Sequence, residues 1–193
     1  PITADLDEQV DESVERPPSL VMAERYFQWA LFYGMFPGFF SEDSATDPFF
    51  ENPEWYNMLR PLFKKYVPLI QQLSTAGWEP ITGAEAPGAR IYLERYGRGQ
   101  QGQVFITARY GDQRWQENTE EGRDVRETLD EPITAEVDVS MAYTGFLGEE
   151  NIEVFDMLAE QPVEIRYEQS HVYYTITLPP HGVHLVRIRP AVN

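Results

Sequence analysis

Residues 133–140 read Ile-Thr-Ala-Glu-Val-Asp-Val-Ser, and this stretch decides the fold class. Apolar side chains occupy every second position, and polar or charged side chains occupy the positions between them. A period of two is the pattern of a β-strand that buries one face and exposes the other to water. We therefore expect a half-buried strand here, with Ile133 and Val137 in the core.

Other stretches of the C-terminal half show a related alternation. Turn-forming residues separate them, as in the glycine-rich 97–102 and in Pro-Pro-His-Gly at 179–182. About seven or eight short strands joined by hairpin-length links, with no helix between them, are typical of an antiparallel β-sandwich. We expect Ile176 and Leu178 in its core. The remaining predicted strands are 89–96, 103–110, 124–129, 163–168, 171–178 and 183–189.

Upstream of these strands the pattern changes to that of a helix. Residues 20–33 are apolar on nearly every side, Ser19 is suited to cap a helix at their start, and Gly34 follows their end. A helix that is apolar nearly all round has to be covered by several neighbours. We therefore expect its packing partners to lie only partly within this chain.

A second helix is predicted over residues 53–76. Apolar side chains recur there at steps of three and four, and a proline stands at the first helical position, where its missing N–H costs nothing. Pro61 and Pro68 each remove a backbone donor from the interior, so we expect them to kink or interrupt this helix.

The predicted fold class is α+β, with an N-terminal helical segment packed on a C-terminal antiparallel β-sandwich. We place the helical segment at residues 19–83 and the sandwich at residues 84–193. Residues 1–18 carry six acidic side chains, one arginine and few apolar side chains, which predicts a flexible acidic arm.

Composition excludes several classes of partner. The 15 Lys and Arg against 32 Asp and Glu give a net charge of −17, so we expect no nucleic-acid partner. With no cysteine, the chain has no disulfide, thiolate zinc site or cysteine nucleophile. It also lacks an apolar run of about 18 residues and, at its start, the features of a signal peptide. We expect no membrane partner, and the compartment, cytoplasmic or exported, stays open.

The sequence contains none of several common catalytic or cofactor-binding motifs. The sequence contains no GxSxG elbow, P-loop, dinucleotide-binding glycine pattern or HExxH, so we expect no cofactor and assign no catalytic residue. His181 and His184 flank a tight turn, and two imidazoles without a third ligand make a weak zinc site. We expect both to be structural or exposed, with no bound metal.

The stretch 36–54 is the strongest candidate for a binding site, because it combines aromatic rings with carboxylates. Paired carboxylates are what glycoside hydrolysis uses, although solvated loop charge is the simpler interpretation. The carboxylates in this stretch are Glu42, Asp43, Asp47, Glu51 and Glu54. Exposed rings stack on the apolar faces of sugars, and core packing is the alternative for each ring. The predicted sugar-contacting residues are Phe36, Phe39, Phe40, Asp43, Asp47 and Trp55.

Two groups of segments resemble the C-terminal end of bacterial glycoside hydrolases in which a (β/α)8 barrel is followed by a β-sandwich. The first group is similar to the final helix, strand, loop and helix of such a barrel: YFQWALFYGMFPGFF at 26–40, RPLFKKYVPLI at 60–70 and AGWEP at 76–80. The second is similar to strands and the closing hairpin of the appended sandwich: IYLERYG at 91–97, residues 104–109 and TLPPHGVHLVRI at 177–188.

This resemblance implies a non-catalytic C-terminal portion of a carbohydrate-active enzyme, inactive alone, whose parent is a glycosidase. In such barrels the catalytic carboxylates stand at the C-terminal ends of central strands, which would precede Pro1. Carbohydrate is the implied ligand, and the first helix would contact an upstream barrel domain or a second copy of the chain. The alternative is a stand-alone carbohydrate-binding or cell-surface interaction module.

Overall fold

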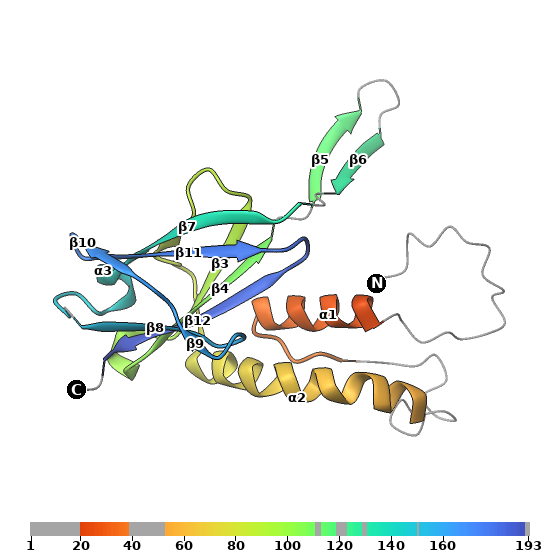
Figure 1. The fold of residues 1–193 in the computed structure, drawn as a ribbon, viewed down its shortest axis with the longest axis horizontal. Coiled ribbons are helices and arrows are strands. Elements are labelled where there is room, and N and C mark those ends of the chain that lie inside the picture. Colours follow the sequence, from red (N-terminus) through yellow and green to blue (C-terminus); the bar gives the residue numbers. More distant parts are fainter. Residues whose placement is uncertain are drawn as a thin grey trace.

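The structure, a computed structural model, describes residues 20–38, 53–110, 113–118, 123–128, 131–149 and 151–191. Two long helices, α1 (Leu20–Phe32) and α2 (Pro53–Ala76), lie against a two-layer β-sandwich (Figure 1). Strand pairs in the described part are antiparallel. The predicted α+β class, a helical segment packed on an antiparallel sandwich, is confirmed.

Two sheets form the layers of the sandwich. The larger one runs β1-β3-β4-β12-β8-β9, with bounds Trp78–Glu79, Ile91–Tyr96, Val104–Tyr110, Val183–Pro190, Ile152–Asp156 and Gln161–Pro162. The smaller one runs β10-β11-β7-β2, with bounds Arg166–Glu168, His171–Leu178, Ile133–Ser140 and Ala84–Glu85. The remaining elements are the β5–β6 hairpin, α3 and a 3-10 turn: Gln113–Asn118, Arg123–Thr128, Met141–Thr144 and Gly99–Gln101.

The alternating strand β7 behaves as its sequence predicts. It pairs with β11 along its whole length, from Ile133 opposite Leu178 to Ser140 opposite His171. Val137, Ile176 and Leu178 are buried between the sheets, and Ile133 packs against the same core while partly buried. The register therefore places every second side chain of both strands in one apolar layer.

Strand β4 is buried on both faces, because the larger sheet is the middle layer of three. Val104 and Ile106 point into the sandwich core, whereas Phe105 belongs to a second apolar cluster beneath the helices. Phe27 of α1 and Tyr66 of α2 are buried in that second cluster and stack with ring centroids 5.9 Å apart. The helices are thus attached to the sandwich through one face of the larger sheet.

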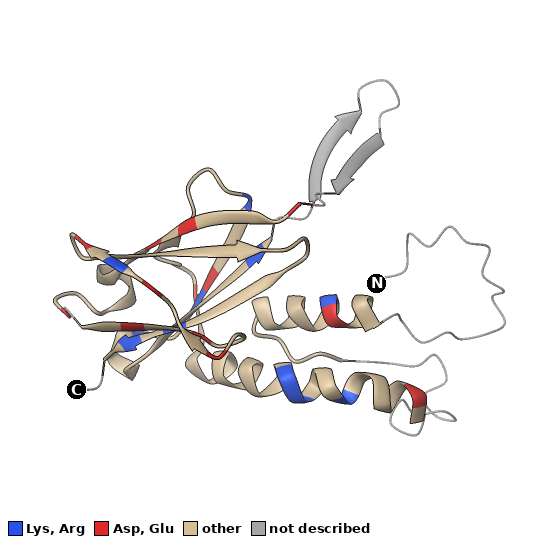
Figure 2. Cartoon of the chain, in the orientation of Figure 1, with Lys and Arg blue, Asp and Glu red and all other residues tan. Residues whose placement is uncertain are grey.

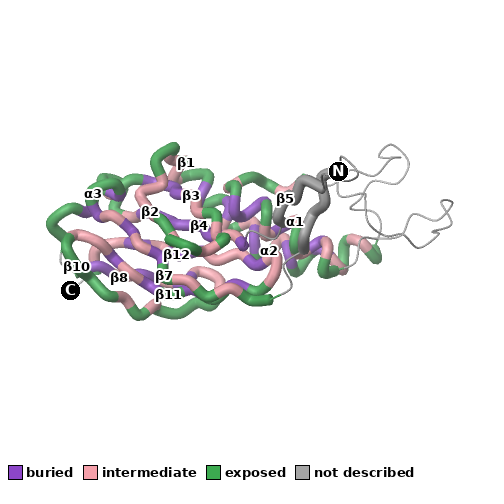
Figure 3. The backbone as a smooth tube through the Cα atoms, turned by 90° about the horizontal axis from the view of Figure 1, so that it is seen from above, coloured by how far each residue is buried: buried purple, intermediate pink, exposed green. Residues whose placement is uncertain are grey.

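The helices extend beyond the sandwich on one side, as two perpendicular views show (Figures 1 and 3). Helix α1 buries Phe27 and Leu31 but leaves Leu20 and Val21 exposed. Helix α2 continues through Pro61 and Pro68, so the expected interruption does not occur. Among the described helices, none is long and apolar enough to cross a membrane.

Some strands depart from the predicted ones. Strand β8 (Ile152–Asp156) is absent from the prediction, yet it pairs with β12 inside the larger sheet. Within the predicted strand 163–168 only Arg166–Glu168 is a strand. Trp78–Glu79, which follows the predicted helix 53–76 within the segment 19–83, forms the edge strand β1, which was not predicted. Short strands of two to five residues carry too few alternations to be recognised without their partners.

Candidate functional site

The six residues predicted to contact sugar fall in three places. Phe36 follows α1 and is 57% exposed. Trp55 lies on α2 and packs, partly buried, against the apolar cluster beneath the helices. Phe39, Phe40, Asp43 and Asp47 lie outside the described residues. The structure does not bring Phe36 and Trp55 into one described site, and the acidic arm at 1–18 is likewise outside the described residues.

A different group of aromatic residues gathers on the helix-side face of the larger sheet. We call it the aromatic face. Its rings are those of Trp29, Tyr33, Trp78 and Tyr92, which are 37%, 45%, 59% and 55% exposed. Glu94 and Arg109 lie among them. Planar rings beside hydrogen-bonding charged groups are suited to bind ligands that have both apolar and polar faces.

Strand alternation positions this face. Leu93 of β3 packs toward the sandwich core, so its neighbours Tyr92 and Glu94 point to the helix side. Tyr92 is directly opposite Arg109, and Trp78 on the edge strand is directly opposite Tyr96. Because the helices contact the sheet mainly through β4 and β12, the outer part of β3 and β1 keeps its side chains open to solvent.

The Arg109 guanidinium is held by rings from two layers. Its Cζ lies 5.0 Å from the centroid of Trp29, 5.5 Å from that of Phe32 and 5.3 Å from that of Tyr92. Cation–π attraction of this kind orients both the cation and the rings. The contact therefore fixes α1 relative to β3 and leaves the outward side of Trp29 and Tyr92 accessible.

Buried polar contacts hold the end of α1 beside the aromatic face. The Phe32 carbonyl accepts hydrogen bonds from the Tyr96 hydroxyl at 2.7 Å and from Thr107 Oγ1 at 3.1 Å. Burial raises the pKa of Tyr96, so its hydroxyl stays a donor. Gly34 has φ +61°, and a Cβ there would lie 2.7 Å from the Tyr96 ring, so the turn after α1 needs glycine.

At the sheet edge, the Trp78 Nε1–H donates to Glu94 Oε2 at 2.7 Å. The bond holds the exposed indole and leaves the other Glu94 oxygen as an acceptor. Trp78 and Tyr92 were not predicted as site residues, because Tyr92 belongs to a strand with the pattern of a half-buried one and Trp78 lies in a two-residue strand that the sequence did not predict. One feature of the sequence could have indicated Tyr92: in β3 (Ile91–Tyr96), Tyr92 and Glu94 alternate with the core position Leu93, so they share the other face of the strand.

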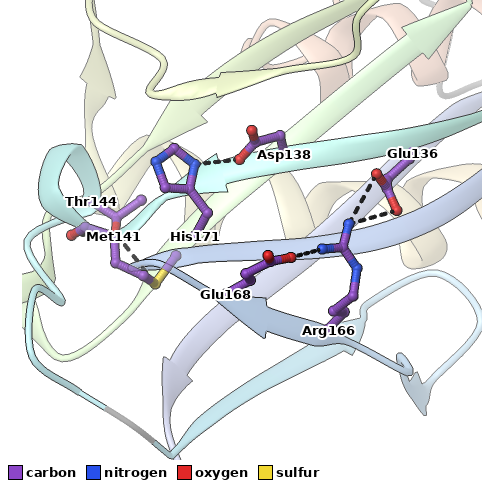
Figure 4. A network of polar contacts seen from close by, with 7 residues as sticks. All are labelled: Glu136, Asp138, Met141, Thr144, Arg166, Glu168 and His171. Atoms are coloured by element: carbon purple, nitrogen blue, oxygen red, sulfur yellow. Dashed lines mark hydrogen bonds and ion pairs between the residues drawn. The ribbon is translucent and has the colours of Figure 1, made fainter.

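The outer face of the smaller sheet has a polar character (Figure 4). His171 Nδ1 lies 2.6 Å from Asp138 Oδ1, and Arg166 pairs with Glu136 at 3.3 Å and with Glu168. Acidic and basic positions are interspersed over the sandwich (Figure 2). Because these charged side chains are paired with each other, we interpret this sheet face as a solvent-facing surface and not as a binding site. Among the described residues, no cluster of His, Cys, Asp or Glu is suited to hold a metal ion.

His184 forms a structural pair with Asp156 at the end of the sandwich. His184 Nε2 lies 2.8 Å from Asp156 Oδ2, while Oδ1 accepts the backbone N–H groups of Leu158 at 2.8 Å and Ala159 at 2.9 Å. Burial would raise the pKa of Asp156, but its hydrogen bonds with His184, Ala159 and Leu158 outweigh burial and lower it. The carboxylate therefore stays ionised and anchors the turn after β8.

No protein-family model matches the sequence, and no curated protein matches it. Twelve chains of solved structures match it, among them several glycoside hydrolases. An α-amylase from Geobacillus thermoleovorans in complex with acarbose overlaps at 15% identity with a TM-score of 0.46, over 88% of this chain and 34% of its own. A family 27 β-L-arabinopyranosidase from Geobacillus stearothermophilus overlaps at 15% identity and a TM-score of 0.42, over 88% and 30%.

An α-L-fucosidase isoenzyme from Paenibacillus thiaminolyticus overlaps at 14% identity and a TM-score of 0.38, over 78% of this chain and 20% of its own. The chain therefore spans about a third or less of each of these enzymes. At such identities and TM-scores the likeness establishes neither a family nor an activity, and the site has to be judged on its own geometry.

Proposed function

We propose that this chain is a non-catalytic, carbohydrate-binding C-terminal portion of a carbohydrate-active enzyme of the glycoside hydrolase kind. The observation that carries the proposal is the aromatic face, where Trp29, Trp78 and Tyr92 are exposed beside Glu94 and Arg109. The segment resemblance given above adds the enzyme class and the position of the chain in its parent.

The chemistry of the aromatic face favours a sugar over a purely apolar partner. Sugar rings present C–H groups on their faces, which stack on aromatic rings, and hydroxyls around their edges, which need donors and acceptors. Glu94 supplies acceptors and Arg109 supplies donors within the same surface. The residues predicted from the sequence to contact sugar stay a separate part of the proposal: Phe36, Phe39, Phe40, Asp43, Asp47 and Trp55.

The exposed flank of α1 belongs to the same proposal. Leu20 and Val21 are open to solvent although the helix is apolar, and an exposed apolar stripe of a few hundred Å² at about 25 cal/mol per Å² leaves several kcal/mol unrealised. In the parent enzyme we assign this flank to an upstream barrel domain. In the isolated chain it would promote self-association.

Binding to a panel of soluble polysaccharides tests the proposal, by affinity electrophoresis and then calorimetry on the best ligand. Tyr92→Ala and Trp29→Ala should each weaken binding about 2- to 10-fold, the range expected for loss of one aromatic contact. Tyr167→Ala is the matched control, since Tyr167 is an exposed tyrosine on β10 of the other sheet. Equal weakening by all three variants, or no binding to any polysaccharide, would contradict the proposal.

The second candidate is a stand-alone carbohydrate-binding or cell-surface interaction module that uses the same aromatic face. The two candidates differ in what precedes Pro1 in the gene. An in-frame barrel domain upstream supports the enzyme portion, whereas a start codon immediately before Pro1 supports the module. Absence of glycosidase turnover by the isolated chain is expected for both, and turnover lost on changing Glu42, Asp43 or Asp47 would overturn both.

A further inference from the structure

A groove that shares no lining residue with the aromatic face is lined, apart from one proline and one alanine, by uncharged polar side chains. It encloses about 440 Å³ between the C-terminal half of α2 and the connection from β3 to β4. This volume lies within the range of small-molecule sites, roughly 300–1,000 Å³. The lining residues are Pro68, Gln71, Gln72, Thr75, Ala76, Gln101 and Gln103. We propose that this groove binds a neutral polyhydroxylated ligand, a short uncharged oligosaccharide.

The hydrogen-bonding groups of the lining side chains indicate which class of ligand the groove can bind. Each glutamine offers two N–H donors and a carbonyl acceptor, and a threonine offers one hydroxyl that does both. A sugar hydroxyl also donates and accepts, so carboxamides match it without a charge on either side. None of the lining side chains is ionisable, in a chain whose net charge is −17. An anionic ligand would find no cation in the groove, and a cationic ligand would find no carboxylate.

Both walls of the groove are fixed by structure that does not depend on a ligand. On one wall, Gln72 and Thr75 lie one turn apart on α2, a helix that the buried Ile70 and Leu73 hold against the larger sheet. On the other wall, Gln101 caps its own turn, because its Oε1 accepts the Arg98 N–H at 2.9 Å. Fixed walls reduce the entropy that a ligand has to overcome on binding.

The other wall is tied to the sheet by further bonds. The Gln101 N–H donates to the Arg98 carbonyl at 2.8 Å, and Arg98 Nε lies 2.6 Å from Glu79 Oε1 on strand β1. The turn therefore cannot move away from α2 without breaking contacts to the sheet edge. The groove is a built feature of the fold rather than a gap beside a loose loop.

Gly97 keeps the base of the groove open. Its N–H donates to the Gly77 carbonyl at 2.8 Å, which joins the ends of β3 and α2. A Cβ at this position would lie 3.3 Å from the Ala76 Cβ and 3.4 Å from Gln101 Oε1, two of the lining residues. With φ at +84°, glycine is the residue that allows both this backbone and this space.

This proposal does not rest on the proposed function, because it uses none of the residues of the aromatic face. The test is calorimetry of the intact chain with three probes: maltotriose, xylotriose and trigalacturonate. Gln72→Leu and Gln103→Leu remove the carboxamides but keep the side-chain size. Gln161→Leu is the matched control, an exposed glutamine on β9 outside the groove lining. Thermal unfolding of each variant verifies that it is folded.

At least one neutral trisaccharide should bind, and each groove variant should weaken that binding about 2- to 10-fold, the range for one lost neutral hydrogen bond. The control should bind as the parent does. Ligand-induced shifts of the Gln72 and Gln103 side-chain NH₂ signals in ¹H–¹⁵N spectra give a second readout. Tyr92→Ala should leave these shifts unchanged.

Three results would overturn the groove proposal: groove variants that bind like the control, side-chain signals that do not move, or tighter binding of trigalacturonate than of either neutral probe. If Tyr92→Ala alone abolishes binding of every saccharide while the groove variants have no effect, the aromatic face stands and the groove proposal fails. If the groove variants lose binding and Tyr92→Ala does not, the outcome is the reverse.

Discussion

The two apolar clusters of this protein differ in how completely the chain itself encloses them. The sandwich core is closed on both sides by strands of the same chain, and Val137 at its centre is 0% exposed. The cluster beneath the helices is closed toward the larger sheet, but the outer flank of α1 is open and Val21 is 62% exposed. The apolar core of the sandwich is therefore buried by the chain itself, whereas α1 keeps apolar side chains exposed on its outer flank.

Introducing an aspartate into each region should give the largest contrast. Val137→Asp places an unpaired carboxylate between the sheets, so we expect a loss of about 4 kcal/mol or more in the free energy of unfolding. Val21→Asp places the same side chain in water, and we expect a change within about 0.5 kcal/mol. Urea unfolding followed by tryptophan fluorescence measures both. Similar losses for the two variants would mean that the flank of α1 is covered in the isolated chain.

A smaller effect is expected at the edge of the sandwich. Asp156→Ala leaves His184 Nε2 and the backbone N–H groups of Leu158 and Ala159 without their acceptor, which should cost about 1–3 kcal/mol. Since folding lowers the pKa of Asp156, its contribution is present above its ordinary value of 3.8 and is lost as pH falls below it.

Urea midpoints measured from pH 7 down to pH 3 test this assignment. The parent should lose stability over the acid part of that range more steeply than Asp156→Ala does. Parallel curves would show that the pair with His184 contributes nothing specific.

Among the polar contacts tested, the smallest effect is expected between the helices. Glu24 accepts from Lys65 Nζ at 2.9 Å and from the Tyr66 hydroxyl at 2.8 Å, and the bond with Lys65 lowers the pKa of Glu24 although burial opposes it. Since Lys65 and Glu24 are part-exposed, Glu24→Gln should cost less than about 1 kcal/mol. The glutamine still accepts from Tyr66, and the difference should vanish as pH falls below the ordinary value of 4.5.

Thermal unfolding of Glu24→Gln at pH 7 and at low pH, each in low and high salt, measures this prediction. A destabilisation above about 2 kcal/mol, or one that persists at low pH, would show that the contact between the helices depends on this carboxylate more than its exposure allows.

The spacing of apolar residues within single segments was sufficient to predict much of the fold. The alternation of β7 and β11 identified both strands and the buried positions Val137, Ile176 and Leu178, since a period of two needs no knowledge of the partner. The same holds for α1 and α2, whose apolar spacing is local. It does not hold for β8, where five residues become a strand because β12 and β9 lie beside them.

The aromatic face could not be predicted from the spacing of residues within any single segment of the sequence. Trp29 comes from a helix, Trp78 from a two-residue edge strand, and Tyr92 from a strand with a buried face, so their nearness depends on strand register and on where α1 ends. The carbohydrate ligand proposed from the sequence was attached to the loop 36–54, of which only Phe36, Pro37, Gly38 and the residues from Pro53 lie within the described part.

The sequence by itself determined the α+β class and the apolar excess of α1, because both follow from the spacing of apolar side chains along the chain. It also determined the antiparallel pairing of the strands, because the links between the predicted strands are short and contain no helix. Only the tertiary structure decided which exposed rings share a surface and which glutamines line a groove. Those neighbours, such as Gln72 and Gln103, come from elements far apart in sequence, and packing of α2 against the sheet brings them together.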